Sequence, residues 1–264
     1  MVDPTPGFTR LALTRARDEP RWIDTRGMLL SGRARIHADA GRLDAGVVVI
    51  VPDSALVSVV GHPDPSLIAR TVTGLSGDVN VLAQMEDADH VARALPGWHR
   101  NRALIHVLPA AASPEEEDEP NARVFTAGSA PQLAHVPDAV RRELLDALRG
   151  RTVSRFVPGA LPQADPIVRT VTVPMAAVWA DGRPVSFCYP VWQTETLWDV
   201  SIETLEGYRR RGFAARVART MIRHMRGTGR APVWGALDTN VASRALAGKL
   251  GFVENAGIAV FTAG

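Results

Sequence analysis

One strand–turn–helix segment constrains the fold of this 264-residue chain more than any other part of its sequence. Residues 197–205 (LWDVSIETL) alternate apolar and polar side chains and are rich in β-branched and aromatic residues, a pattern typical of a half-buried strand. After a turn, apolar side chains recur along one helical stripe until Gly227, which suits a C-terminal cap. The stripe consists of Phe213, Val217, Met221, Ile222 and Met225. The pattern therefore predicts a strand, a glycine turn and a helix, in that order.

The turn at 208–214 (YRRRGFA) has the chemistry of an anion site. A helix N-terminus leaves its first N–H groups unpaired and carries a partial positive charge, so an anion can satisfy both. Gly212 has no Cβ and lets a phosphate approach the backbone, and Ala214 keeps the first helical turn small. The three consecutive arginines add positive charge. An ordinary turn with a solvated basic cluster fits the same residues, so this segment alone leaves both interpretations open.

A second segment narrows the choice. Residues 240–252 (NVASRALAGKLGF) read as a helix that begins after the capping residue Asn240 and stops at Gly251. Between the two helices, residues 232–237 read as a short strand. Together the two segments resemble the GNAT superfamily of CoA-dependent N-acetyltransferases. Its R/Q-x-x-G-x-G/A and N-x-x-A/S…K-L-G-F signatures are matched by Arg209, Gly212, Ala214, Asn240, Ser243 and residues 249–252.

The resemblance covers the second half of the chain and implies a fold and a co-substrate. Residues 198–204 and 247–252 look most like the branch that includes zwittermicin-resistance acetyltransferases. For residues 123–264 the implied fold is α/β (α+β), with a mixed, mostly antiparallel sheet and helices on both faces. The implied co-substrate is acetyl-CoA, with no metal.

The coenzyme-binding residues follow from the same resemblance. In the family the two central strands separate, which would place the thioester near residues 202–205 and 234–237. Asn240 and Ser243 match positions that contact the coenzyme, although capping and packing of the last helix is an equally good role for Asn240. The expected coenzyme-binding residues are Leu205, Arg209, Arg210, Arg211, Gly212, Phe213, Ala214, Asn240 and Ser243.

Acetyl transfer to an amine also needs a base, because a substrate ammonium is protonated near neutral pH. Glu203 and Asp199 are four residues apart and so share one face of the strand, which would let both approach the acceptor. Glu203 is our first candidate because it is nearest the predicted thioester, and Asp199 is the second. Either could instead face solvent or pair with an arginine. Many GNAT members carry a tyrosine that protonates the departing thiolate, and the matching position here is Ala247. A CoA thiolate can leave without such an acid, because a thiol pKa is about 8.5.

The remaining C-terminal segments predict the rest of this domain. Residues 123–125 read as a first strand and 137–149 as a helix. Residues 175–180 and 185–189 read as a hairpin, joined by a turn in which Asp181–Gly182 suits positive φ. Residues 257–261 read as the closing strand. Cys188, the only cysteine, lies in the hairpin and excludes an internal disulfide and a multi-cysteine metal site.

The first half predicts a second domain. Residues 1–109 are expected as an α/β domain, and residues 110–122, with the acidic run EEEDEP, as a solvated linker. The predicted elements are strands at 46–51, 55–60, 79–82 and 103–108 and helices from about 65 and 88. Their order echoes the second half of a GNAT domain. Because Pro63 and Pro65 occupy the turn where amides would be needed, we expect a degenerate GNAT-like domain without coenzyme.

Composition and charge limit the function classes. The chain is 46% hydrophobic and 22% charged, as in soluble globular proteins, and its N-terminus lacks a secretory h-region, so we expect a cytoplasmic protein without a membrane span. From Asn121 onward it carries 18 basic and 11 acidic residues, against 12 and 17 before. This charge suits a phosphate-bearing ligand. Without a nucleic-acid-binding motif, we expect no nucleic-acid partner.

The sequence therefore predicts an acetyl-CoA-dependent N-acetyltransferase that acts on a small-molecule amine. The alternative is a CoA-binding or interaction module that has lost catalysis, consistent with Ala247. The acceptor and the oligomeric state are left open.

Overall fold

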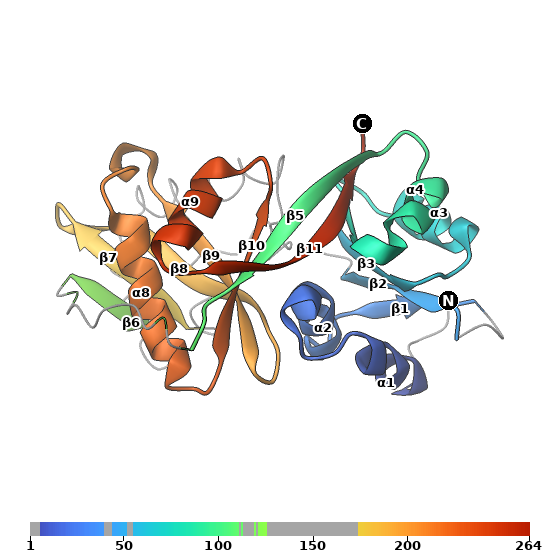
Figure 1. The fold of residues 1–264 in the computed structure, drawn as a ribbon, viewed down its shortest axis with the longest axis horizontal. Coiled ribbons are helices and arrows are strands. Elements are labelled where there is room, and N and C mark those ends of the chain that lie inside the picture. Colours follow the sequence, from blue (N-terminus) through green and yellow to red (C-terminus); the bar gives the residue numbers. More distant parts are fainter. Residues whose placement is uncertain are drawn as a thin grey trace.

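In the described part of the chain, one eleven-stranded sheet runs through both halves (Figure 1). The computed structural model describes residues 6–39, 44–51, 55–110, 112, 119, 121–125 and 174–264. The strands are β1 (Arg35–His37), β2 (Gly46–Val51), β3 (Leu56–Gly61), β4 (Asn80–Gln84), β5 (His99–Val107), β6 (Ala122–Phe125), β7 (Met175–Ala180), β8 (Arg183–Gln193), β9 (Leu197–Thr204), β10 (Ala231–Leu237) and β11 (Val253–Thr262). Their order across the sheet is β1-β2-β3-β4-β11-β5-β10-β9-β8-β7-β6.

Helices cover this sheet on both faces. The α-helices are α1 (Pro6–Arg15), α2 (Ile23–Leu30), α3 (Pro65–Thr73), α4 (Ala88–Ala94), α8 (Phe213–Arg226) and α9 (Val241–Lys249). The short 3-10 helices among the described residues are η1 (Pro20–Trp22), η3 (Met85–Asp87) and η5 (Glu206–Tyr208). Only β3–β4 and β9–β10 pair in parallel, and the other neighbouring strands of the described sheet are antiparallel. The expected mixed, mostly antiparallel sheet with flanking helices is confirmed.

The two halves repeat one order of elements. The series β2, β3, α3, β4, α4, β5 in the first half matches β8, β9, α8, β10, α9, β11 in the second. In both series a hairpin leads into a strand–helix–strand unit whose two strands are parallel. This repetition agrees with the GNAT-like order expected for the first half.

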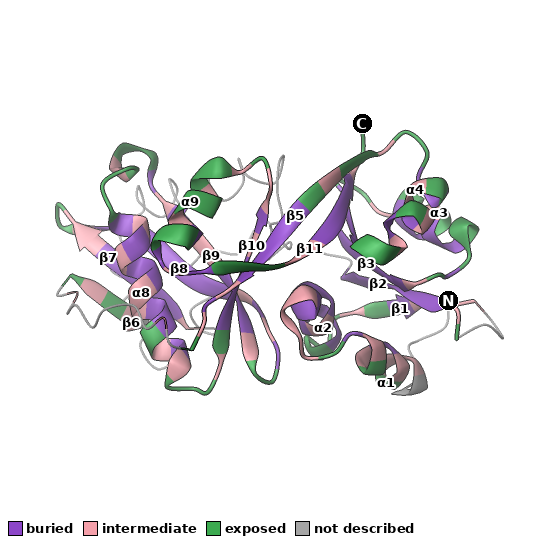
Figure 2. Ribbon diagram, in the orientation of Figure 1, coloured by how far each residue is buried: buried purple, intermediate pink, exposed green. Residues whose placement is uncertain are grey.

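Within the shared sheet, the last strand of each half pairs with a strand of the other half. β5 pairs with β10 of the second half, from Val107↔Val233 to Ala103↔Leu237. β11 pairs with β4 of the first half, from Ile258↔Gln84 to Thr262↔Asn80. The two exchanged strands are antiparallel neighbours at the centre of the sheet, where they cross in Figure 1. Both are exposed over their first residues and buried further on (Figure 2).

The cores lie on opposite faces of this shared sheet. In the second half, α8 places Met221, Ile222 and Met225 against Trp198 of β9 and Trp234 of β10. On the other face, α1 and α2 pack on the first half and also on β8, where the Cβ of Trp192 lies so close to Gly27 that any side chain there would collide with it. The N-terminal helices therefore contact both halves.

Most elements that the sequence predicted are present, with shifted ends. Asp181 and Gly182 both have positive φ, at 51° and 73°, as the hairpin between β7 and β8 required. Helices α1 and α2 and strand β1 were not predicted. The helix expected at 137–149 lies outside the described residues.

The predicted linker is corrected at one position. The side chain of Glu119 is only 8% exposed and pairs with Arg216 of α8, so this residue is not solvated as expected. Ala122, at the end of the predicted linker, already belongs to β6. The proposed division of the chain into 1–109, 110–122 and 123–264 stays a prediction.

The strand exchange predicts that neither half is stable alone. A fragment of residues 119–264 would lose β5, leaving the edge of β10 unpaired and β11 without either neighbour, and unpaired strand edges promote aggregation. We expect this fragment and residues 1–112 to aggregate when expressed separately and to purify as a one-to-one complex when coexpressed. Size-exclusion chromatography with light scattering checks this. A monomeric 119–264 fragment that melts at the temperature of the full chain would contradict it.

Candidate functional site

The candidate site is a cleft that opens where β9 and β10 separate. Their parallel pairing starts at Leu197↔Ala231 and ends at Asp199↔Val233, although both strands continue beyond these residues. The cleft has a volume of about 680 Å³. It is lined by Val200, Ser201, Ile202, Glu203, Thr204, Tyr208, Arg209, Arg210, Gly212, Phe213, Ala214, Ala215, Trp234, Gly235, Ala236, Leu237, Asn240, Ala242, Ser243, Leu246 and Lys249.

The basic turn forms one end of this cleft. Arg210 and Gly212 both have left-handed backbone conformations, with φ of 60° and 85°, and α8 begins at Phe213. Among the described residues, no backbone hydrogen bond uses the N–H groups of Gly212, Phe213 or Ala214. A Cβ on Gly212 would meet no atom within 4 Å, so its face of the turn is open. The turn therefore presents free N–H donors at a helix N-terminus, as an anion site requires.

Tyr208 fixes the turn to the β7–β8 hairpin. Its hydroxyl donates a hydrogen bond of 3.0 Å to Asp181 Oδ2. The guanidinium groups of Arg183 and Arg211 lie 5.3 and 5.2 Å from its ring centroid, within cation–π range. Of the three consecutive arginines, Arg209 and Arg210 line the cleft, whereas Arg211 stacks on Tyr208 and does not.

The start of α9 forms the opposite wall. The Asn240 carboxamide caps this helix by accepting a hydrogen bond of 3.2 Å from the Ser243 backbone N–H. The Ser243 hydroxyl accepts a hydrogen bond of 2.9 Å from Trp234 Nε1. Both residues line the cleft, so each combines the capping or packing role with a position from which it can contact a ligand. Ala247, a residue of α9, is fully buried.

The structure separates the two candidate bases. Glu203 is 5% exposed and lines the cleft. Asp199 is also buried, but it does not line the cleft and lies near Asp24 of α2. Burial, followed by the charge of Asp24, raises the pKa of Asp199 well above its usual range. Asp199 is therefore suited to hold a proton rather than to accept one.

Other groups near β9 have structural roles. Glu195 accepts two hydrogen bonds from Arg26, which lower the pKa of its carboxyl. The Leu205 side chain packs in the core with Met175 and Phe187 and does not line the cleft. Burial raises the pKa of the Cys188 thiol, which excludes a ready thiolate nucleophile.

The matching turn of the first half is already satisfied. Asp64 caps α3 by accepting a hydrogen bond of 2.8 Å from the Ser66 N–H, and Pro63 and Pro65 contribute no donors. The pairing of β3 with β4 extends to Val59↔Ala83, close to the ends of both strands, so they do not separate as β9 and β10 do. The absence of a coenzyme site from this half stays a prediction.

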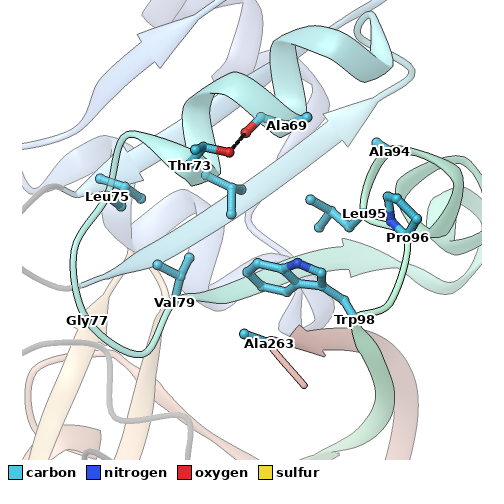
Figure 3. Close-up of a pocket in the computed structure, with 11 residues that line it drawn as sticks. Ala69, Thr73, Leu75, Gly77, Val79, Ala94, Leu95, Pro96, Trp98 and Ala263 are labelled. Atoms are coloured by element: carbon cyan, nitrogen blue, oxygen red, sulfur yellow. Dashed lines mark hydrogen bonds between the residues drawn. The ribbon is translucent and has the colours of Figure 1, made fainter.

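A second hollow in the first half lacks the groups that an anion needs. It has a volume of about 320 Å³ and lies at the ends of α3 and α4, with Leu95 and Trp98 among its lining residues (Figure 3). Its lining includes no charged side chain, and the Thr73 hydroxyl donates to the Ala69 carbonyl at 2.8 Å. This hollow is not a counterpart of the cleft.

Sequence reasoning missed two contributions to the site, and one residue that lies near Asp199 outside the cleft. Trp234 was expected in a strand near the thioester, but the hydrogen bond by which its indole holds Ser243 in place was not predicted. Lys249, read as part of a signature, lines the cleft and adds a cation. Asp24 carried no local signal, because its partner lies far away in the sequence.

Comparison with known proteins agrees with this geometry. Residues 176–261 match the family model described as GNAT acetyltransferase. A search of curated proteins found no match.

Three solved structures resemble the chain over nearly its whole length. A GCN5-related N-acetyltransferase-like protein from Streptococcus suis 89/1591 has a TM-score of 0.62 at 14% identity, covering 97% of this chain and 98% of that one. A GNAT-family protein from Novosphingobium aromaticivorans has a TM-score of 0.60 at 17% identity, covering 93% and 96%. A GCN5-related N-acetyltransferase from Kribbella flavida has a TM-score of 0.60 at 15% identity, covering 94% and 95%. At these identities the likeness shows the fold alone, so the chain has the fold of GNAT-like proteins, and its residues 176–261 match the GNAT acetyltransferase family model.

Proposed function

We propose that this protein transfers the acetyl group of acetyl-CoA to the amine of a small molecule. One observation carries the proposal: the cleft between β9 and β10 ends at the N-terminus of α8, where N–H donors without described partners surround the left-handed Gly212. A cleft that runs from a sheet opening to an anion site suits a long ligand with a phosphate group at one end.

The pyrophosphate of the coenzyme would bind at the basic turn. The N–H groups of residues 210–214 would donate to its oxygens, and the charges of Arg209, Arg210 and Lys249 would attract it. The rest of the coenzyme would lie along residues 200–204, beside Asn240 and Ser243. Leu205 would act indirectly by packing in the core beneath the site, and Arg211 by holding the ring of Tyr208.

Glu203 is the proposed base. It would take a proton from the acceptor ammonium, directly or through water, and the freed amine nitrogen would attack the thioester carbon. As the C–S bond breaks, the sulfur leaves as a thiolate, and the second proton of the attacking nitrogen passes to it through solvent, yielding a neutral amide and the CoA thiol. Neither tyrosine of the chain is needed for this step, because the thiolate is a tolerable leaving group.

A second function, CoA binding without catalysis, is favoured by Ala247, which is buried where family members carry a tyrosine. An amine panel separates the two functions. Release of CoA thiol with any acceptor supports the enzyme, whereas coenzyme binding without thiol release for every acceptor supports the binding module. The resemblance of residues 198–204 to the zwittermicin-resistance branch makes antibiotic-like amines the first acceptors to try.

The coenzyme site predicts the effect of a charge at the turn. Gly212→Asp should weaken CoA binding at least about 100-fold, because a carboxylate would lie against the pyrophosphate. Gly229→Asp is the matched control, since Gly229 also has positive φ, at 79°, and open space around it, but lies after the far end of α8. Calorimetric titration with CoA checks both variants. Equal affinities would show that the anion site is assigned wrongly.

The base assignment predicts a separate effect on turnover. Glu203→Gln should lower kcat by about 100-fold and leave CoA affinity unchanged, because it removes a proton acceptor without changing the shape of the cleft. Glu206→Gln, an exposed neighbour in η5, should keep full turnover. Thiol release measured with a reactive acceptor tests this. Full activity of Glu203→Gln would show that another group acts as the base.

A further inference from the structure

We infer that the Ser243 hydroxyl donates a hydrogen bond to the sulfur that leaves during acetyl transfer. Ser243 is the third residue of α9 and lines the cleft. The inference rests on the proposed function and deepens it, because it assigns to one side chain the stabilisation of the charge that develops on the leaving group.

The hydroxyl of Ser243 has a proton to donate. The Trp234 indole N–H, which can only donate, lies 2.9 Å from Ser243 Oγ, so the serine oxygen is the acceptor of this bond. Among the described residues, no acceptor takes the hydroxyl proton of Ser243. In α8, by contrast, the Thr220 hydroxyl donates to the Arg216 carbonyl four residues earlier, at 3.1 Å. The proton of Ser243 is therefore available to a ligand.

This hydroxyl is also held in position. Trp234 is only 4% exposed, and its ring meets the ring of Phe252 edge-on, with the centroids 5.3 Å apart. The Asn240 carboxamide accepts a hydrogen bond of 3.2 Å from the Ser243 backbone N–H. Both the backbone and the Oγ atom of Ser243 are thus fixed by the protein, so its hydroxyl is preorganised for a ligand.

The other hydroxyl groups that line the cleft are engaged or lie on the other side. The Tyr208 hydroxyl donates to the turn between β7 and β8 at 3.0 Å. Thr204 Oγ1 lies 2.8 Å from Ser186 Oγ, with which it shares a hydrogen bond. Ser201 is on β9, where strand alternation places its side chain on the sheet face away from α8. In the described cleft, Ser243 thus provides the available hydroxyl on the side of α8 and α9.

The Ser243 hydroxyl lies at the end of the cleft away from the anion site. Trp234 directly follows Val233, the last residue of β10 that pairs with β9, so its hydrogen bond to Ser243 lies where the cleft closes. The anion site lies beyond Thr204, where β9 ends. From Val200 to Thr204 the strand extends about 13 Å, at about 3.3 Å per residue. A coenzyme with its phosphates at the turn would therefore bring the thioester, at the far end of its pantetheine arm, towards Ser243.

A donor at this place favours the breaking of the thioester. The bond between the amine nitrogen and the carbonyl carbon forms, the C–S bond breaks, and its electron pair stays on the sulfur. A hydrogen bond to the resulting thiolate is stronger than one to the neutral thioester, because the acceptor is charged, and it therefore lowers the barrier. Ser243 keeps its own proton, since the proton of the CoA thiol comes from the attacking nitrogen through solvent.

Bound CoA provides a test that needs no turnover. A hydrogen bond to the sulfur favours the thiolate, so the ratio of thiolate to thiol should be about tenfold higher for CoA bound to the wild type than to Ser243→Ala. Ser243→Thr, which keeps a hydroxyl, should restore most of this ratio. Thr220→Ala is the matched control, since the Thr220 hydroxyl is used within α8, and it should leave the ratio unchanged.

The thiolate is measured by its ultraviolet absorbance, as the difference between the complexes with CoA and with desulfo-CoA. Equal ratios for the wild type and Ser243→Ala would overturn the inference.

Turnover separates this inference from the function on which it rests. With an acceptor that the wild type uses, Ser243→Ala should lower kcat by about 10-fold with little change in the KM for acetyl-CoA. Trp234→Phe, which loses the indole N–H that fixes Ser243, should have a smaller effect of the same kind. A larger loss in Ser201→Ala than in Ser243→Ala would place the donor on β9 and overturn the assignment.

The two proposals can fail separately. If the wild type binds CoA but releases thiol with no acceptor, the proposed acetyl transfer fails, and the thiolate ratio still decides whether Ser243 contacts the sulfur. If the wild type does not bind CoA, both proposals fail.

Discussion

The pairing of β5 with β10 is the interaction on which the proposed site depends. β10 leaves β9 after Val233, and over the same residues, from Val233 to Leu237, it is paired with β5. The backbone groups on one edge of β10 are therefore satisfied by the first half of the chain, while the other edge faces the cleft. Loss of hydrogen bonds on both edges of a strand would be strongly destabilising, because its backbone N–H and C=O groups would be left unpaired. The first half thus helps to keep the cleft open.

The difference between the halves rests on a few side chains. Both contain a parallel strand pair connected by a helix, yet only the helix that follows Gly212 begins with available N–H donors. In the first half, Asp64 and two prolines use or remove the equivalent donors. The same backbone architecture therefore presents N–H donors without described partners at the helix start of one half and a capped helix start in the other. No helix in the described part of the chain is both long and apolar enough to span a membrane.

The local elements were predictable because their signals are local. The stripe from Phe213 to Met225 and the Asp181–Gly182 turn depend only on neighbouring residues, and both have the predicted structures. The positions of Arg209, Gly212 and Asn240 at the cleft followed from two signatures and their order. Helix α2 was missed because Asp24, Arg26 and Gly27 interrupt any apolar stripe. The role of each depends on a residue that is distant in the sequence, such as Glu195 for Arg26 and Trp192 for Gly27.

The strand exchange could not be read from the sequence for a related reason. The alternation within β5 and β11 is the same whichever neighbour each strand has, so their partners are set by the assembled sheet. The burial of Glu119 against Arg216 is a similar case, in which an acidic run that suggests solvent contains one residue with a specific partner.

The exchanged strands also bear on how such a chain can change over time. If a gene duplication produced two complete domains, each with its own last strand, either copy could later be deleted without structural cost to the other. Once β5 and β11 lie in each other's sheets, deleting either half removes a central strand from the half that remains. The exchange would thus preserve the first half whatever it binds, since selection on the second half acts on both.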